Sequence, residues 1–186
     1  MSKGLTMKKI IASLLFVCAL FSSAYATSYV IVEEGMSLLV GKTKIYNGTP
    51  VEVKSQSSKN ATVIIKGFIN PLDAKSLYAT KNLKLLLAQV NDDSMIQKAG
   101  DQGTLEIEIE AKYLVENADL AWEKSTDRFY EKCTKCHAAK VVKDHTMLEW
   151  EGLYESMKEF AKPTDDDTSH ILRFLRAYAK DGILSE

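Results

Sequence analysis

The chain has 186 residues, of which 46% are hydrophobic and 26% are charged. A chain of this length holds one ordinary domain or two small ones, each with a limited core. Its 24 basic and 25 acidic residues nearly cancel, so the composition gives no support to a nucleic-acid-binding protein, which needs a concentrated basic face.

The first 26 residues have the order of a secretory signal peptide. Lys8 and Lys9 precede the apolar run 10–21, and the small residues Ala24 and Ala26 follow it, which predicts export and cleavage after Ala26. The run is shorter than the roughly 20 apolar residues of a membrane helix, so we expect no membrane span in the mature chain. Retention of the segment as an anchor is the minor alternative. Of the 24 basic residues, three are lysines within 1–26, which leaves 21 against 25 acidic residues after cleavage.

Between residue 28 and about residue 113, hydrophobic and polar residues alternate as they do in half-buried antiparallel strands. Turn residues such as Asn47-Gly48 separate the alternating segments. Several short strands at such spacings predict a small barrel, and this part of the chain contains no cluster of His, Cys or paired carboxylates. The expected strands are 29–32, 51–54, 62–68, 83–90 and 105–110.

From Asn117 onward the hydrophobic period changes to that of helices. The first helix is expected to run directly into a cysteine motif, because residues fall at three- and four-residue steps at Trp122, Thr126, Phe129, Tyr130 and Cys133. A second helix is expected at about 148–160.

A third helix is expected to follow Pro163, which ends the second. Thr164 and the acidic run 165–167 resemble a helix cap and first turn, because carboxylates complement the positive end of the helix dipole. We interpret this acidic run as a solvated helix start.

The motif Cys133-Thr134-Lys135-Cys136-His137 has the C-x-x-C-H pattern of covalent haem c attachment. Two thiols at this spacing can add to the two vinyl groups of one haem, and the adjacent His137 is placed to be the proximal iron ligand. Export fits this chemistry, because such attachment takes place outside the bacterial cytoplasm. Cys18 is removed with the signal peptide.

Two other uses of the cysteines carry less weight. A thiol redox pair belongs to a mixed sheet and helix unit that this helical segment lacks. A structural zinc site usually needs four ligands, for which the candidates are Cys133, Cys136, His137, His145 and His170. We therefore expect one covalently bound haem c.

The distal iron ligand is left open between several side chains. Met157 is favoured because it lies on the same face of the second helix as Trp150, and Met147 and His145 are the alternatives, followed by an open site. A thioether ligand raises the reduction potential relative to a second imidazole, which suits a carrier that feeds a high-potential acceptor. His170 is interpreted as a surface or core-edge residue, and Trp122 and Trp150 as haem-packing aromatics.

The helical segment resembles the C-terminal monohaem domain of cytochromes that serve bacterial trimethylamine N-oxide reductases. The resemblance is carried by 133–137, His145, Trp150, Met157 and 175–181. The strand-rich part resembles the bacterial SH3-like barrel of the same proteins, through 48–53 and 61–68.

This resemblance implies an α+β chain with a signal peptide (1–26), a small all-β SH3-like barrel (27–116) and a small all-α cytochrome c-like haem domain (117–186). It implies a periplasmic electron-transfer protein rather than an enzyme, with an upstream cytochrome as donor and a molybdenum N-oxide or S-oxide reductase as acceptor. The chain has no second C-x-x-C-H motif, so the quinol-oxidising module of multihaem members is missing.

Two other hypotheses come from different classes. One is a haem-based sensor or ligand-binding module with an open sixth position on the iron. The other is a wall- or peptide-binding SH3-like protein to which a haem domain is appended.

Overall fold

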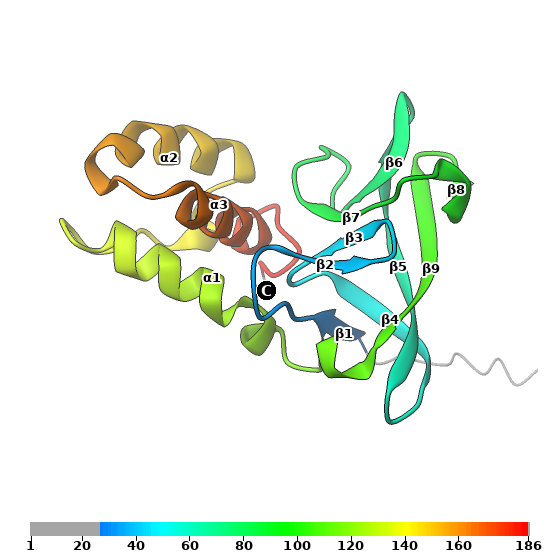
Figure 1. Cartoon of the computed structure of the whole chain (residues 1–186). Coiled ribbons are helices and arrows are strands. Elements are labelled where there is room, and N and C mark those ends of the chain that lie inside the picture. The colour runs from blue at the N-terminus through cyan, green and yellow to red at the C-terminus, as the bar shows by residue number, and fades with distance from the viewer. Residues whose placement is uncertain (1–26, 186) are drawn as a thin grey trace, which may run out of the picture.

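The computed structural model describes residues 27–185. The expected signal peptide, and with it cleavage after Ala26, lies outside the described residues. The described chain forms a curled antiparallel sheet followed by three helices, which gather on one side of the sheet (Figure 1). The helices are α1 (Ala118–Cys133), α2 (Met147–Ala161) and α3 (Asp165–Tyr178).

The sheet has ten strands and is organised around β5. This strand pairs with β9 along residues 60–68, and on its other edge with β4 at residues 61–64 and with β6 at residues 68–70, so the sheet bends at β5 into a half-barrel. The pairing order along the sheet is β10-β1-β4-β5-β6-β7-β3-β2, with β9 joining β5 to β8. The strands are β1 (Thr27–Val30), β2 (Ser37–Val40), β3 (Thr43–Tyr46), β4 (Pro50–Gln56), β5 (Asn60–Asn70), β6 (Asp73–Tyr78), β7 (Leu86–Gln89), β8 (Ile96–Ala99), β9 (Gln102–Glu110) and β10 (Leu114–Val115).

The expected fold class, an SH3-like barrel followed by an independent all-α cytochrome c-like domain, is wrong. Five of the ten strands, β2, β3, β6, β8 and β10, were not expected, and they extend the sheet into a half-barrel whose ends are β10 and β2. The helices do not bury their apolar faces only among themselves. Trp122 and Ala177 form a core cluster with Leu85, in the loop before β7, so the helices and the sheet share buried surface.

The turn that follows β3 joins the helices to the sheet. The Asn47 side-chain amide donates to the Ala121 carbonyl oxygen (2.6 Å), and Arg173 of α3 donates to the Asn47 carbonyl oxygen (2.7 Å). Gly48 has a φ of +73°, and the Trp122 ring occupies the space where a β-carbon of residue 48 would lie. Both α1 and α3 therefore contact the sheet part through the Asn47-Gly48 turn.

Gly48→Ala is expected to lower the free energy of unfolding by about 3 kcal/mol. A left-handed conformation costs an L-residue roughly 1–2 kcal/mol, and overpacking a buried ring adds about 1–3 kcal/mol. Gly35→Ala is the matched control, since Gly35 has the same φ of +73° and nothing within 4 Å of its β-carbon position. Denaturant unfolding of both variants measures this effect. Equal losses of unfolding free energy in the two variants would show that Trp122 does not limit the size of the residue at position 48.

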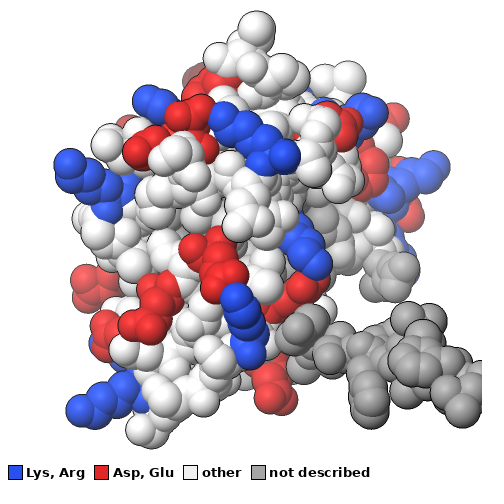
Figure 2. All heavy atoms as spheres, turned by 90° about the vertical axis from the view of Figure 1, so that its right-hand side faces the viewer, with Lys and Arg blue, Asp and Glu red and all other residues white. Residues whose placement is uncertain are grey.

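Exposed charges on the outer face of the sheet are of both signs and lie close together (Figure 2). Lys66 of β5 pairs with Glu52 of the neighbouring β4 (2.7 Å), and Lys54 of β4 pairs with Glu106 of β9 across the intervening β5 (2.8 Å). Pairs of this kind contribute little to stability but leave no large field of one sign. Within residues 27–185, no helix is long and apolar enough to cross a membrane.

Candidate functional site

Helix α1 carries the first cysteine of the motif at its last residue. The helix starts at a sequence-encoded cap, where the Asn117 side chain accepts a hydrogen bond from the Asp119 amide (2.8 Å). At the other end, the Thr134 hydroxyl donates to the Tyr130 carbonyl oxygen (2.6 Å). The chain then leaves the helix as an irregular segment, so Cys133 is held on a rigid element while Cys136 and His137 lie on a loop.

The three motif residues differ in their surroundings. Cys133 is half-buried against the helical core, and this burial raises the pKa of its thiol. Cys136 and His137 are exposed. His137 Nδ1 lies 2.8 Å from the Ala138 carbonyl oxygen, and because a carbonyl can only accept, Nδ1 carries the proton. In the neutral ring, the lone pair of Nε2 is then free to bind a metal, which is the tautomer that an iron ligand requires.

Cys133 and Met157 line the same apolar pocket. All three helices contribute to it, with Phe129 beside Cys133 on α1, Trp150 and Tyr154 on α2, and Ile171 and Leu175 on α3. Its volume is about 20 Å³, whereas pockets that hold small molecules and cofactors measure roughly 300–1,000 Å³. The thiol, the thioether and the apolar lining suit a haem, but the pocket itself is too small to hold one.

The other candidate ligands lie elsewhere. Met147 is fully buried with its sulfur 3.9 Å from the Asn82 side-chain amide. His145 packs edge-on against Trp150, with 5.1 Å between ring centroids. Neither residue lines the pocket shared by Cys133 and Met157. Among residues 27–185, no group of three or more His, Cys, Asp or Glu side chains is arranged to hold a metal ion.

The surroundings of His170 and Trp122 differ from those expected from the sequence. His170 is buried between α1 and α3, with Nδ1 2.9 Å from the Ser125 hydroxyl, so its interpretation as a surface or core-edge residue is wrong. Trp122 packs in the junction between helices and sheet, three turns of α1 before Cys133. Of the two tryptophans, Trp150 is the one that lines the pocket with Cys133.

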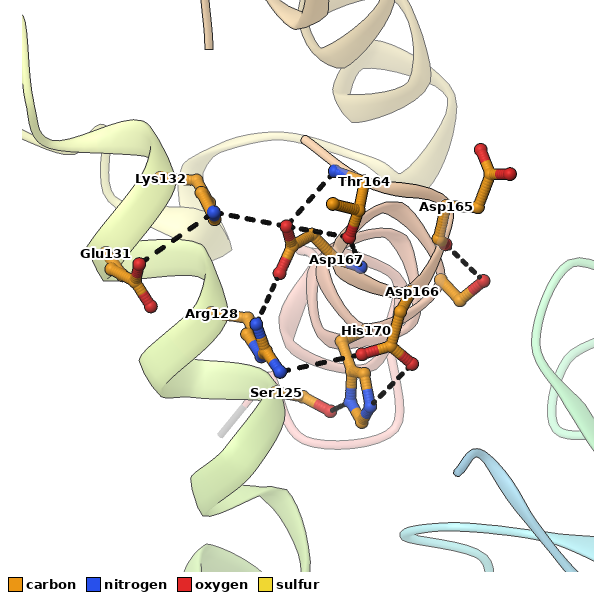
Figure 3. Close-up of polar contacts among 10 residues, drawn as sticks. Ser125, Arg128, Glu131, Lys132, Thr164, Asp165, Asp166, Asp167 and His170 are labelled. Atoms are coloured by element: carbon orange, nitrogen blue, oxygen red, sulfur yellow. Dashed lines mark hydrogen bonds and ion pairs between the residues drawn. The ribbon is translucent and has the colours of Figure 1, made fainter. Parts of the chain in front are cut away.

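The acidic start of α3 fastens this helix to α1 (Figure 3). Asp167 is 1% exposed and pairs with Arg128 (2.7 Å) and Lys132 (3.2 Å), one turn apart on α1. It also closes the cap of α3 by accepting from the Thr164 amide (3.1 Å). The interpretation of the acidic run as a solvated helix start is thus wrong at Asp167. The signal in the sequence was the cap pattern of Thr164 with Asp167, combined with two basic residues four apart on α1.

Asp167 is expected to make the fold acid-sensitive. Burial alone would raise the pKa of this carboxyl, but hydrogen bonds from Thr164 and the charge of Lys132 outweigh burial and lower the pKa to about 2. The unfolded pKa is about 4, so the ionised carboxylate adds about 2 kcal/mol of stability at neutral pH. Because the folded pKa is the lower one, this contribution is fully present above about pH 5 and is lost as the pH falls from about 5 to about 2.

Unfolding free energies measured across this pH range test the prediction with Asp167→Asn. The variant should lose about 2 kcal/mol at pH 7 and close the gap to wild type near pH 2. Asp165→Asn is the control, because Asp165 is exposed in the same helical turn. A gap that stays constant from pH 7 to pH 2 would rule out the paired carboxylate as the cause.

The structure thus brings together Cys133, Met157 and Trp150 from α1 and α2, and it leaves Cys136 and His137 on the adjoining loop. Sequence reasoning missed Tyr154 and Leu175 as members of the pocket, although both lie at helical spacing from residues already singled out. In comparisons with protein-family models, with curated proteins and with solved structures, the chain matches none of them.

Proposed function

We propose that this protein is an electron carrier with one haem c, bound covalently through Cys133 and Cys136. His137 is the proximal iron ligand and Met157 the distal one. The observation that carries the proposal is the shared apolar pocket of Cys133 and Met157, which joins the end of α1 to the far half of α2. The Nδ1–H of His137, which faces the Ala138 carbonyl oxygen, supports the ligand role of its Nε2.

Each residue has a separate task in this proposal. Haem iron supplies reversible one-electron chemistry when bound. Cys133 anchors one edge of the macrocycle to a rigid helix, whereas Cys136 and His137 belong to a segment that can adjust. The apolar side chains of Trp150, Ile171 and Leu175 keep water from the pocket, and a sulfur ligand together with this low polarity raises the reduction potential.

The resemblance to cytochromes of trimethylamine N-oxide respiration supports the choice of partners. We propose a periplasmic location, an upstream cytochrome as electron donor and a periplasmic molybdenum N-oxide or S-oxide reductase as acceptor. The protein itself is then a carrier and not an enzyme. The N-terminal sequence pattern of residues 1–26 supports export.

Stopped-flow oxidation of the reduced protein by a purified trimethylamine N-oxide reductase tests the carrier role. The expected result is oxidation of the haem on mixing when the reductase has its N-oxide substrate. Exposure of the untreated reduced protein to carbon monoxide is the companion measurement. Rapid binding of carbon monoxide combined with no oxidation by the reductase would replace the carrier by the haem-based sensor.

A further inference from the structure

The half-barrel is open along one side, and a groove lies in this opening. β2 is the last strand at one end of the half-barrel and pairs only with β3, so its other edge is free (Figure 1). β9 pairs with β8 through residues 102–105, so the edge of residues 106–110 that faces away from β5 has no partner strand within residues 27–185. Residues 38–41 of the first edge and 108–110 of the second line the same groove, which measures about 340 Å³.

The free edge of β2 presents main-chain groups that have no partner strand in the described part of the chain. Val40 and Thr43 flank a two-residue turn and are paired with each other, and along two antiparallel strands the residues alternate between bonding to the partner strand and pointing away from it. The N–H and C=O groups of Ser37 and Leu39 therefore point to the free edge. Charged residues or prolines commonly block such edges, and residues 37–40 contain neither. This edge can therefore accept a further strand.

A second groove, of about 230 Å³, continues along β2 toward the start of the strand. It shares Leu38, Leu39 and Tyr113 with the first groove. Leu39 is 64% exposed, whereas its neighbours Leu38 and Val40 pack against the core of the sheet. Tyr113 directly precedes β10, which is the other end of the half-barrel. The two grooves thus follow the whole length of β2, as an extended peptide beside this strand would.

The rim of the two grooves is acidic. Glu33 and Glu34 line the second groove, and Glu108 and Glu110 line the first. Glu110 pairs with Lys112 (3.0 Å), whereas the other three carboxylates form no ion pair within residues 27–185. Among the described residues, no lysine or arginine lines either groove. Uncompensated carboxylates along a groove attract basic groups.

We propose that this opening binds an extended peptide segment that carries basic side chains. The segment adds to β2 as a further strand, and its main chain pairs with the free groups of Ser37 and Leu39. Because the side chains of a strand alternate between its two faces, the basic side chains can all lie on the outer face, beside Glu108 and the acidic start of β2. The grooves share no residue with the pocket of Cys133, so this binding site is separate from the one in the proposed function.

Binding of a synthetic peptide to the matured full-length protein tests the proposal. The probe is a short fluorescently labelled peptide in which lysine and valine alternate. One comparison peptide has glutamate in place of lysine, and another keeps the lysines but is N-methylated on its main chain, which removes the donors of a strand. Fluorescence anisotropy at low ionic strength is expected to show binding of the probe, with both comparison peptides at least about tenfold weaker. Equal binding of the N-methylated peptide would overturn the proposal.

Charge-neutralised variants separate this site from general attraction between charges. Glu33→Gln with Glu34→Gln and Glu108→Gln is expected to weaken binding of the probe about tenfold at low ionic strength and by much less at high salt. The matched control removes three exposed, unpaired carboxylates from α1 and should bind the probe as the wild type does; it is Asp119→Asn with Glu123→Gln and Asp127→Asn. Equal losses in the two variants would overturn the proposal.

Amide hydrogen exchange locates the bound peptide. The amides of Ser37 and Leu39 should exchange more slowly when the probe is present, because each gains an acceptor on the added strand. Unchanged exchange at both amides under saturating probe would contradict strand addition at β2. Sedimentation of the protein alone is the companion measurement, since self-association that excludes the probe would assign the free edge to a second copy of the chain instead.

Discussion

Arg173→Met is expected to destabilise the protein by about 3 kcal/mol. Arg173 is buried in α3 and donates to two carbonyl oxygens of the sheet part, those of Asn47 (2.7 Å) and Leu86 (2.6 Å). Its guanidinium also lies 5.4 Å from the ring centroids of both Tyr46 and Trp122. Burial lowers the pKa of Arg173 to about 9, which still leaves it charged at neutral pH.

The size of the effect follows from what a methionine leaves behind. Methionine fills much of the space but donates no hydrogen bond, so one buried and one partly buried carbonyl lose their partner, at about 1–3 kcal/mol each. Arg176→Met is the control, since Arg176 is in the next turn of α3 and pairs with Glu151 (2.9 Å) at a partly exposed site. Its loss should be about 1 kcal/mol or less.

Thermal and denaturant unfolding of Arg173→Met and Arg176→Met measure the two losses of stability. A single cooperative transition at a lower midpoint for Arg173→Met is expected, because α3 and the sheet share one core. Two separate transitions in the wild-type protein would contradict the view that helices and sheet unfold as one unit.

Met157→Leu is expected to remove the sulfur ligand from the iron completely while leaving the haem attached. Leucine keeps the apolar lining of the pocket but has no atom that binds iron. The weak long-wavelength band of ferric haem with a methionine ligand should vanish, and the reduction potential should fall. Oxidised and reduced visible spectra, followed by a redox titration, measure both effects.

Met147→Leu is the matched control for this experiment. Met147 is also on α2 but is fully buried and lies outside the pocket of Cys133. Its replacement should leave the band unchanged. A band that survives Met157→Leu and disappears in Met147→Leu would transfer the distal role to Met147, and a wild type without the band would point to His145 or an open site.

The helices could be predicted closely from the sequence because their ends are encoded locally. Asn117, Thr146 and Thr164 all cap helices by accepting a backbone hydrogen bond with their side chains. The second helix was expected at about 148–160 and is Met147–Ala161, followed by Lys162 in a left-handed conformation. Each of these signals lies within a few residues of the feature that it determines.

The sheet could be predicted only where its strands are long and alternating. β4, β5 and β9 show the expected alternation, but short strands such as β2 and β8 have no periodicity that separates them from loops. Their pairing depends on contacts between residues far apart in the chain. For this reason the sequence indicated a small barrel where the chain forms a larger, open half-barrel.

The cysteine motif can be recognised in the sequence, whereas the surroundings of the candidate site cannot. The C-x-x-C-H spacing identifies Cys133, Cys136 and His137 without any knowledge of the fold. In contrast, an arginine such as Arg173 gives no sign in the sequence that it is buried, because its two acceptors are main-chain carbonyls of the sheet part. The burial of Asp167 could not be predicted for a similar reason, since its partners Arg128 and Lys132 are on another helix.

The proposed function requires covalent haem attachment before anything else, and the intact mass of the exported protein measures it. The chain is produced with a haem-attachment system, and the denatured, acid-extracted protein is weighed beside Cys133→Ser, Cys136→Ser and the double variant. The wild type should exceed the mass of the mature polypeptide by one haem, and the double variant should have the mass of the polypeptide alone. A wild type that carries no added haem, or that loses all of it on acid extraction, would contradict the account.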